Sequence, residues 1–294
     1  MRRQPSLARR LFDRFEPVHA VTYFAPEARA ALDGLGFRGF WMGYFAARSA
    51  PFGKVPPEVV TAAFYSFTPE RVAKALPAVW DIASPADALR ARESSAVAAL
   101  RRAGVTDDEA TAAADAAYRA AASAEVGGRT LYAANKALPW PEEPLARLWH
   151  ATTLLREHRG DGHVAVLTAE RLSGRDANVL HAAAGRVPEA MIKRGRDYDD
   201  EQWADCQSRL RERGLLDEAG ALSSAGRELK QHIEDATDAA ALTALDVLDD
   251  AEVESLFRAL TPITRKVVAA GDVPDGTPMG LRRDDLDDDS AHLG

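Results

Sequence analysis

The stretch DDEQWADCQSRLRERGLLDEAGALSSAGRELKQHIE, residues 199–234, decides the fold that this sequence predicts. Asp199 stands at the position of a helix N-cap, and apolar residues follow it at spacings of three and four. Two apolar pairs flank the turn-forming segment 217–220, which predicts a small β-hairpin. Ser223 or Ser224 then begins another helix. The stretch therefore predicts a capped helix, a hairpin and a second helix in succession.

The rest of the chain also predicts helices. Residues 84–104 and 106–128 each run from a candidate N-cap, Ser84 or Thr106, to a glycine. Valine and isoleucine runs with strict alternation are missing from the sequence. The predicted fold class is therefore mainly α, with the hairpin as its β-structure.

An internal repeat relates two parts of the chain. The segments KVPPEVVTAAFYSFTPERVAKALPAV (54–79) and GRVPEAMIKRGRDYDDEQWADCQSRL (185–210) align without a gap. Caps and apolar positions stay in phase: Pro57 falls on Pro188, Phe67 on Tyr198, Thr68 on Asp199, Val72 on Trp203 and Val79 on Leu210. At a larger offset, Asp107 and Glu109 fall on Asp250 and Glu252. A chance match between helices of similar composition is the alternative, but we favour a duplication. The predicted domains are 1–140 and 141–275, followed by a flexible acidic tail at 276–294 with little to bury.

The stretch 199–234 is similar to a winged-helix domain of the MarR class, in which a helix ending in Leu-x-x-x-Gly-Leu, here 210–215, leads into a wing. Residues 8 to 280 as a whole resemble an actinobacterial family of helix-turn-helix proteins called SalK-like. The resemblance rests on EPVHAVTYFAPEA (16–28), GYFAARSAPFG (43–53), LWHATTLLREHRGDGH (148–163) and RLRERGLL (209–216). It implies two tandem winged-helix-like halves, with the hairpin wing in the second.

The charge of the chain argues against DNA binding. The net charge is −8, and between Arg194 and Asp235 seven basic residues face eleven acidic ones. Four acidic residues, Asp199, Asp200, Glu201 and Asp205, crowd the start of the helix that would read the bases. Because contact with phosphates requires cations, we expect DNA to be an unlikely partner.

Composition limits the cellular setting. The single cysteine, Cys206, excludes an internal disulfide, and no run is apolar and long enough to span a bilayer. The first residues lack the apolar core of a signal peptide. We therefore expect a cytoplasmic protein with no membrane association, and the sequence does not predict its oligomeric state.

The segment LLREHRGDGHVAVL, residues 154–167, is the densest group of polar residues beside apolar ones. On one helix, His150, Thr153, Glu157 and His158 would share a stripe apart from the core face. Gly160 and Gly162 predict the end of that helix, with Asp161 as the cap of the next helix and His163 close behind it. A solvated face with a capped turn is one interpretation. We favour a site in which Arg156 and Arg159 bind an anion and His150, His158 or His163 transfers protons.

The segment FEPVHAVTYFAPEA, residues 15–28, offers a second group of polar residues, including His19 and Tyr23. Pro17 predicts a kink or a helix start beside Glu16. The Glu16-x-x-His19 spacing is typical of di-iron sites, which need further ligands such as His150 and Glu157. We predict no cofactor, and a metal ion at these four residues is the less favoured alternative to a core-facing histidine.

The segment GFRGFWMGYFAARSAPFG, residues 36–53, is the most distinctive apolar stretch. We expect Phe40, Phe45 and, farther along, Phe64 to pack in the core. Trp41, Tyr44, Arg48 and Tyr65 could instead line a pocket for a planar or acidic metabolite.

The sequence thus predicts a protein that binds one small aromatic or anionic metabolite between two winged-helix-like halves. Glu157, Arg159 and Asp161 join the residues above as expected ligand contacts. An enzyme that uses the same pocket, with a histidine as acid or base, is one alternative. A MarR-like transcriptional regulator is the other.

Overall fold

The computed structural model describes residues 3–185, 187–274, 279 and 281–293. These residues form α-helices joined by short connections, with three short 3₁₀ helices at 50–52, 78–81 and 243–245. The helices are α1 (Pro5–Phe24), α2 (Pro26–Gly34), α3 (Gly39–Ser49), α4 (Pro57–Phe64), α5 (Pro69–Ala73), α6 (Pro85–Arg102), α7 (Asp107–Ser123), α8 (Thr130–Lys136), α9 (Pro144–Ala169), α10 (Gly174–Ala183), α11 (Glu189–Arg196), α12 (Asp200–Glu212), α13 (Ser224–Leu242) and α14 (Asp250–Ala269). The prediction of a mainly α fold is confirmed.

Several helix starts lie where the sequence predicts them. Ser84, Thr106 and Asp199 cap α6, α7 and α12, and each takes part in a reciprocal capping box with the third helical residue. Thr68 caps α5, and Ser223 rather than Ser224 caps α13. These short polar side chains satisfy amide groups that the first helical turn leaves without a partner, so the local sequence is enough to place them.

The prediction of a β-hairpin wing is wrong. A single antiparallel bridge joins Leu216 to Leu222, and among the described residues no β-strand forms. The amide of Asp217 donates to the carbonyl of Ala221 at 2.9 Å, which closes the turn. Because Ser223 already caps α13, too few residues remain after the turn to extend the pairing.

The predicted break at Gly160 and Gly162 is also wrong, because α9 runs unbroken from Pro144 to Ala169. Asp161 therefore caps no helix; its carboxylate accepts a hydrogen bond from the amide of Tyr132 at 2.8 Å. A Cβ on Gly162 would lie 2.7 Å from Nη1 of Arg129 and 3.5 Å from the Cβ of Ala240. The glycine thus allows close packing rather than ending the helix.

Pro17 likewise does not start a separate helix, since α1 is helical from Pro5 to Phe24 and Pro17 lies inside it. Nearly every residue of α1 from Leu7 to Thr22 is buried. The packing of this helix against α9, α13 and α14 outweighs the missing amide of the proline.

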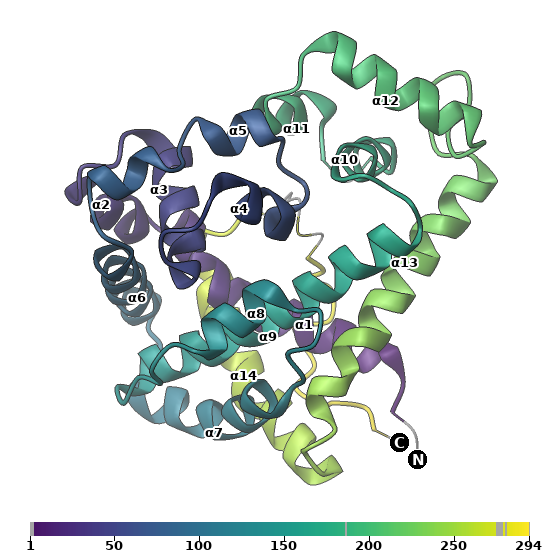
Figure 1. Cartoon of the computed structure of the whole chain (residues 1–294). Helices are drawn as coiled ribbons and strands as arrows, with labels where there is room; N and C mark the ends of the chain where they lie inside the picture. The colour runs from purple at the N-terminus through teal and green to yellow at the C-terminus, as the bar shows by residue number, and fades with distance from the viewer. Residues whose placement is uncertain (1–2, 186, 275–278, 280, 294) are drawn as a thin grey trace.

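Three apolar clusters hold the helices together. The largest joins α1, α7, α9 and α14, and small buried alanines on α7 let it approach α9 closely. A second cluster lies around α3 to α5, and a third lies around α10 to α13. The predicted boundary at residue 140 falls between helices that share the largest cluster. Figure 1 shows α9 crossing the middle of the molecule, with α10 to α12 beyond one end and α13 running back toward α14.

The described part of the acidic tail packs on the helices. Nε of Arg10 donates to Oδ2 of Asp285 at 2.7 Å, and Nη1 of Arg14 donates to the same oxygen at 3.1 Å. Leu286 and Ala291 are buried, although the sequence predicts little burial here. Within the described residues, no helix has both the length and the apolar character that a membrane crossing requires.

Candidate ligand cavity

A cavity of about 850 Å³ lies between the two predicted halves. Its walls come from α1, α3 and α4 on one side and from α10, α11 and α13 on the other, and α9 contributes to the floor. This volume is within the range that holds a small organic molecule.

The polar stripe of α9 is buried and not solvated. His150, Thr153, Glu157 and His158 are each no more than 2% exposed. Other helices cover α9 on several sides, so the stripe faces different neighbours along its length. The interpretation as a solvated face with a capped turn is therefore wrong.

Glu157 forms the centre of a buried ion-pair group. Its carboxylate accepts from Nη1 of Arg156 at 2.7 Å and from Nη2 of Arg48 at 3.3 Å. Burial alone would raise the pKa of Glu157, but the charges of Arg156 and Arg48 outweigh burial and lower it to about 2. Glu157 is thus a fixed anion that holds two arginines at the cavity.

Glu16 on α1 lies beside the same ion-pair group, but here burial outweighs the nearby positive charges in setting the pKa. It lines the cavity, is fully buried, and neither carboxylate oxygen has a hydrogen-bond partner among the described residues. Nε of Arg156 lies 3.6 Å from Oε2, an ion-pair distance without a hydrogen bond. Burial raises the pKa of Glu16 to about 7, and the charge of Glu157 adds to the rise against the opposing effect of Arg156.

Aromatic side chains form one wall. The rings of Tyr23 and Tyr44 lie 5.4 Å apart, and Tyr44 lies 5.5 Å from Phe67. The guanidinium of Arg48 stacks over Phe64 at 4.2 Å and donates to the hydroxyl of Tyr44 at 3.0 Å. The wall is therefore apolar with polar tips, as a site for a planar ligand requires.

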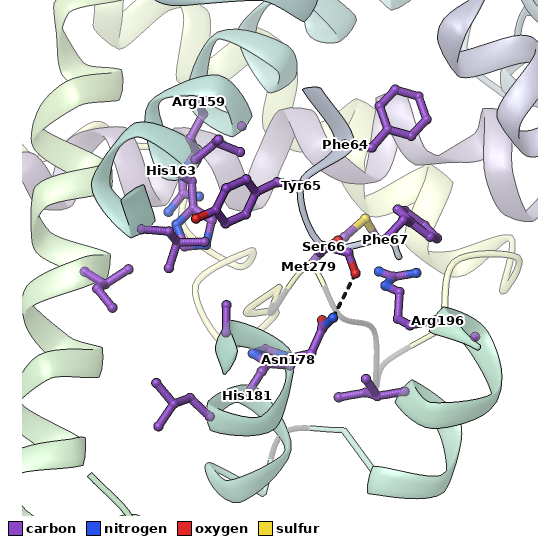
Figure 2. Close-up of a pocket in the computed structure, with 18 of the residues that line it drawn as sticks. Phe64, Tyr65, Ser66, Phe67, Arg159, His163, Asn178, His181, Arg196 and Met279 are labelled. Carbon is purple, nitrogen blue, oxygen red and sulfur yellow. Dashed lines mark hydrogen bonds between the residues drawn. The ribbon is translucent and has the colours of Figure 1, made fainter. Parts of the chain in front are cut away.

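Arg196 enters the cavity from the end of α11. Its guanidinium lies 3.8 Å from the ring centre of Phe67. Figure 2 shows the two side chains next to each other. In the part of the chain that the structure describes, no carboxylate pairs with Arg196, and its Nε has no hydrogen-bond partner. Burial lowers its pKa, and the nearby charge of Arg48 adds to that effect. Arg196 is thus a half-buried cation at the cavity without a counter-ion among the described residues.

Away from Arg196, the side chains of Arg159 and His163 at the cavity already have partners. Nη2 of Arg159 donates to Oδ1 of Asp238 at 2.6 Å, and Nδ1 of His163 lies 2.9 Å from Oγ1 of Thr237. Burial lowers the pKa of His163 to about 4, so its imidazole is neutral near pH 7.

A hydrogen bond across the cavity ties the two walls together. Nδ2 of Asn178 on α10 donates to the carbonyl of Ser66 at 2.8 Å (Figure 2). The hydroxyl of Tyr65 donates to the carbonyl of Leu172 beside it. These bonds fix the loop that follows α4 against the start of α10.

The structure brings most of the predicted site residues together. Nine of them line the cavity: Tyr23, Trp41, Tyr44, Arg48, Tyr65, Arg156, Arg159, Asp161 and His163. Two more contact lining residues from behind, because Glu157 binds Arg48 and Arg156, and Nε2 of His19 lies 3.0 Å from the hydroxyl of Tyr23.

Two predicted catalytic histidines lie elsewhere. The ring of His150 packs against Trp140 at 4.7 Å, and that of His158 packs against Tyr132 at 5.2 Å. Burial lowers the pKa of His150 to about 4 and that of His158 to about 3. Neither lines the cavity, so the assignment of these two histidines to the pocket is corrected.

The possible metal site does not assemble either. His150 and His19 face different neighbours, and Glu16 and Glu157 are both next to Arg156. No group of three or more His, Cys, Asp or Glu side chains in the described ranges is arranged to hold a metal ion.

Two contributions escaped the sequence analysis. Arg196 and Asn178 lie outside the motifs that drew attention, although both line the cavity. Gly195 gives no signal of them, because a Cβ there would lie 3.4 Å from the indole of Trp41, an ordinary van der Waals distance. Phe40, predicted to lie in the core, is 40% exposed at the cavity, whereas Phe45 and Phe64 are buried as predicted.

Comparison with known proteins gives one match. Residues 8–274 match the model of a helix-turn-helix family, so the chain belongs to that family. No curated protein and no solved structure matches the chain significantly.

Proposed function

We propose that this member of a helix-turn-helix family binds one small aromatic molecule with an acid group in the cavity between its halves. The observation that carries the proposal is Arg196, a cation at the cavity with no carboxylate partner among the described residues. A buried charge without a counter-ion is costly, and an anionic ligand would remove that cost.

The charge of the whole lining supports an anion. Among the described lining residues eight are basic and three are acidic, in a chain whose net charge is −8. The basic ones are Arg9, Arg48, Arg156, Arg159, Arg196, Arg227, Lys230 and Arg282; the acidic ones are Glu16, Asp161 and Glu234. Low-dielectric walls strengthen the attraction of such a lining for an anion.

The aromatic wall supports a planar group next to the acid. Phe67 stacks under Arg196, and the tips of Trp41, Tyr44 and Tyr65 also line the space. Offset stacking on these rings would hold an aromatic ligand. Because the opposite wall has few aromatic side chains, the cavity is asymmetric and suits one ligand per chain.

The proposal includes the predicted duplication and winged-helix-like halves. Repeat-matched positions are buried in both copies: Phe67 and Tyr198, Val72 and Trp203, Val79 and Leu210. At the larger offset, α7 and α14 both begin with a capping box, formed by Thr106 with Glu109 and by Asp249 with Glu252. The repeated order of elements supports a regulator-like dimer joined in one chain, with the seam as the ligand site.

Family membership favours a second function, DNA binding. The outer side of α12 argues against it, because Asp199, Asp200, Glu201 and Asp205 are all exposed. These carboxylates would meet the phosphates that a reading helix must approach. We therefore propose weak or no DNA binding, with the fold serving as a scaffold for the cavity.

Thermal-shift measurements with matched acids and amides test the proposal. Indole-3-acetate and 4-hydroxycinnamate should raise the Tm in a dose-dependent manner, and indole-3-acetamide and 4-hydroxycinnamide should do so less. Arg196→Met should remove the advantage of the acids. Arg194→Met is the matched control, because Arg194 is exposed on the same helix and does not line the cavity. Equal shifts for acids and amides, or no shift with any of the four, would contradict the proposal.

A further inference from the structure

Glu16 is a carboxylate at the cavity that lacks hydrogen bonds among the described residues. Both of its oxygens are acceptors without a donor among the described residues, and the carboxylate is fully buried. Buried carboxylates in folded proteins are normally hydrogen-bonded, since an isolated one is strongly disfavoured. Glu16 is one of the residues that line the cavity, so the missing donor can belong to a molecule bound there.

Arg156 does not donate a hydrogen bond to Glu16. Arg156 directs Nη1 to Glu157 at 2.7 Å, and its Nε stays 3.6 Å from Glu16. Arg48 also binds Glu157 and donates to Tyr44. Arg156 and Arg48 are therefore engaged by Glu157, and Arg159, whose charge also acts on Glu16, is engaged by Asp238.

We propose that Glu16 accepts a hydrogen bond from an O–H or N–H group of the ligand, while Arg196 binds its acid group. The ligand class is then an aromatic acid that carries a hydroxyl, amine or ring N–H apart from its carboxylate. This inference rests on the proposed function and narrows it. Glu16 and Arg196 both line the cavity, and the charge of Arg48 acts on both of them.

The ionisation of Glu16 gives the inference a pH signature. An ionised carboxylate is the stronger acceptor, and burial raises the pKa of Glu16 to about 7. Affinity for a ligand with a donor should therefore rise between pH 6 and pH 8. Affinity for an acid without a donor should not follow this course.

Calorimetric titration with two pairs of acids tests the inference. Indole-3-acetate is compared with benzofuran-3-acetate, and 4-hydroxycinnamate with 4-methoxycinnamate, on the full chain. At pH 8 the donor-bearing acid of each pair should bind about 10-fold to 100-fold more tightly, the range expected for a hydrogen bond to a charged group. Glu16→Met should abolish this preference, and Glu16→Gln, which keeps a weaker neutral acceptor, should reduce it. Glu201→Gln, an exposed change on α12, is the matched control and should preserve it.

Each outcome of these titrations either supports or overturns the role of Glu16. Preference in the wild type that is lost in Glu16→Met and rises with pH supports the inference. Equal affinity within both pairs, or a preference that survives Glu16→Met, overturns it while leaving the proposed acid site intact. If none of the four acids binds, the proposed function fails and the inference fails with it. Retained far-UV circular dichroism in each variant shows that any loss is not unfolding.

Discussion

The cavity lining and the outer side of α12 carry opposite charge. Among the described lining residues, basic side chains are more than twice as many as acidic ones, whereas the exposed start of α12 bears four carboxylates. In a helix-turn-helix family the reverse would be expected, with cations on the outer helix that faces DNA. This difference is the basis of our proposal that the cavity binds a small anion and that the outer side of α12 does not bind a duplex.

Removing the charge of Glu157, the centre of the buried ion-pair group, should change the stability of the protein most. Glu157→Gln leaves Arg48 and Arg156 buried without the carboxylate that pairs with both of them. Removing one partner of a buried pair costs about 3 kcal/mol or more, so the free energy of unfolding should fall by that amount in urea denaturation at pH 7. Glu201→Gln should leave it unchanged. A loss below about 1 kcal/mol would mean that the cations are not held by Glu157.

Neutralising Glu16 should instead raise the free energy of unfolding. Glu16 has a folded-state pKa of about 7 against an ordinary value of 4.5, so the folded protein keeps a proton there that the unfolded chain has lost. Its contribution to stability is thus favourable below pH 4.5 and is lost as the pH rises to 7. Glu16→Gln should match the wild type at pH 4.5 and exceed it by roughly 2 to 3 kcal/mol at pH 8.

Urea denaturation of both proteins across this pH range measures the difference. A constant difference between wild type and Glu16→Gln at every pH would show that Glu16 has an ordinary pKa. Lower stability of the variant at pH 8 would show that Glu16 is satisfied by donors within the chain.

The contact between the two walls should be sensitive to a single methyl group. A Cβ on Gly174 would lie 1.8 Å from the carbonyl oxygen of Tyr65, and backbone must move to accommodate it. Gly174→Ala should cost about 1 to 3 kcal/mol in urea denaturation and weaken binding of aromatic acids. Gly34→Ala, where nothing lies within 4 Å, is the matched control. An unperturbed Gly174→Ala variant would mean that the walls are not in contact there.

The smallest effect concerns DNA. Fluorescence anisotropy with a labelled random duplex should show no binding at 150 mM salt and little at 50 mM, because the outer side of α12 repels phosphates. Replacing Asp199, Asp200, Glu201 and Asp205 by their amides should raise the affinity slightly at low salt. Tight wild-type binding that weakens steeply with salt would reverse the comparison of the two regions.

The caps and the helical class could be predicted from the sequence because they depend on local residues. Ser84, Thr106 and Asp199 satisfy amides two or three residues away, so each is visible in a short window. The continuity of α9 could not be predicted, since Gly162 ends a helix in isolation but here fits against Arg129 and Ala240. Tertiary packing overrode the local preference.

The site was predicted in part for a similar reason. Trp41, Tyr44 and Arg48 share a helical face, and that spacing brought them to one cavity. His158 lies close to Arg156 in sequence, yet it packs against Tyr132 because different helices cover the turns of α9. The missing counter-ion of Arg196 depends on residues far apart in the chain, so no sequence pattern signals it.

The most direct test is a calorimetric titration of indole-3-acetate at pH 7 into the wild type, Arg196→Met and Arg194→Met. The account predicts saturable binding of one molecule per chain to the wild type and to Arg194→Met. Affinity for Arg196→Met should be about 10-fold to 100-fold lower, as expected for the loss of a charge-assisted hydrogen bond. Equal affinity in the wild type and Arg196→Met, or no binding to either, would contradict it.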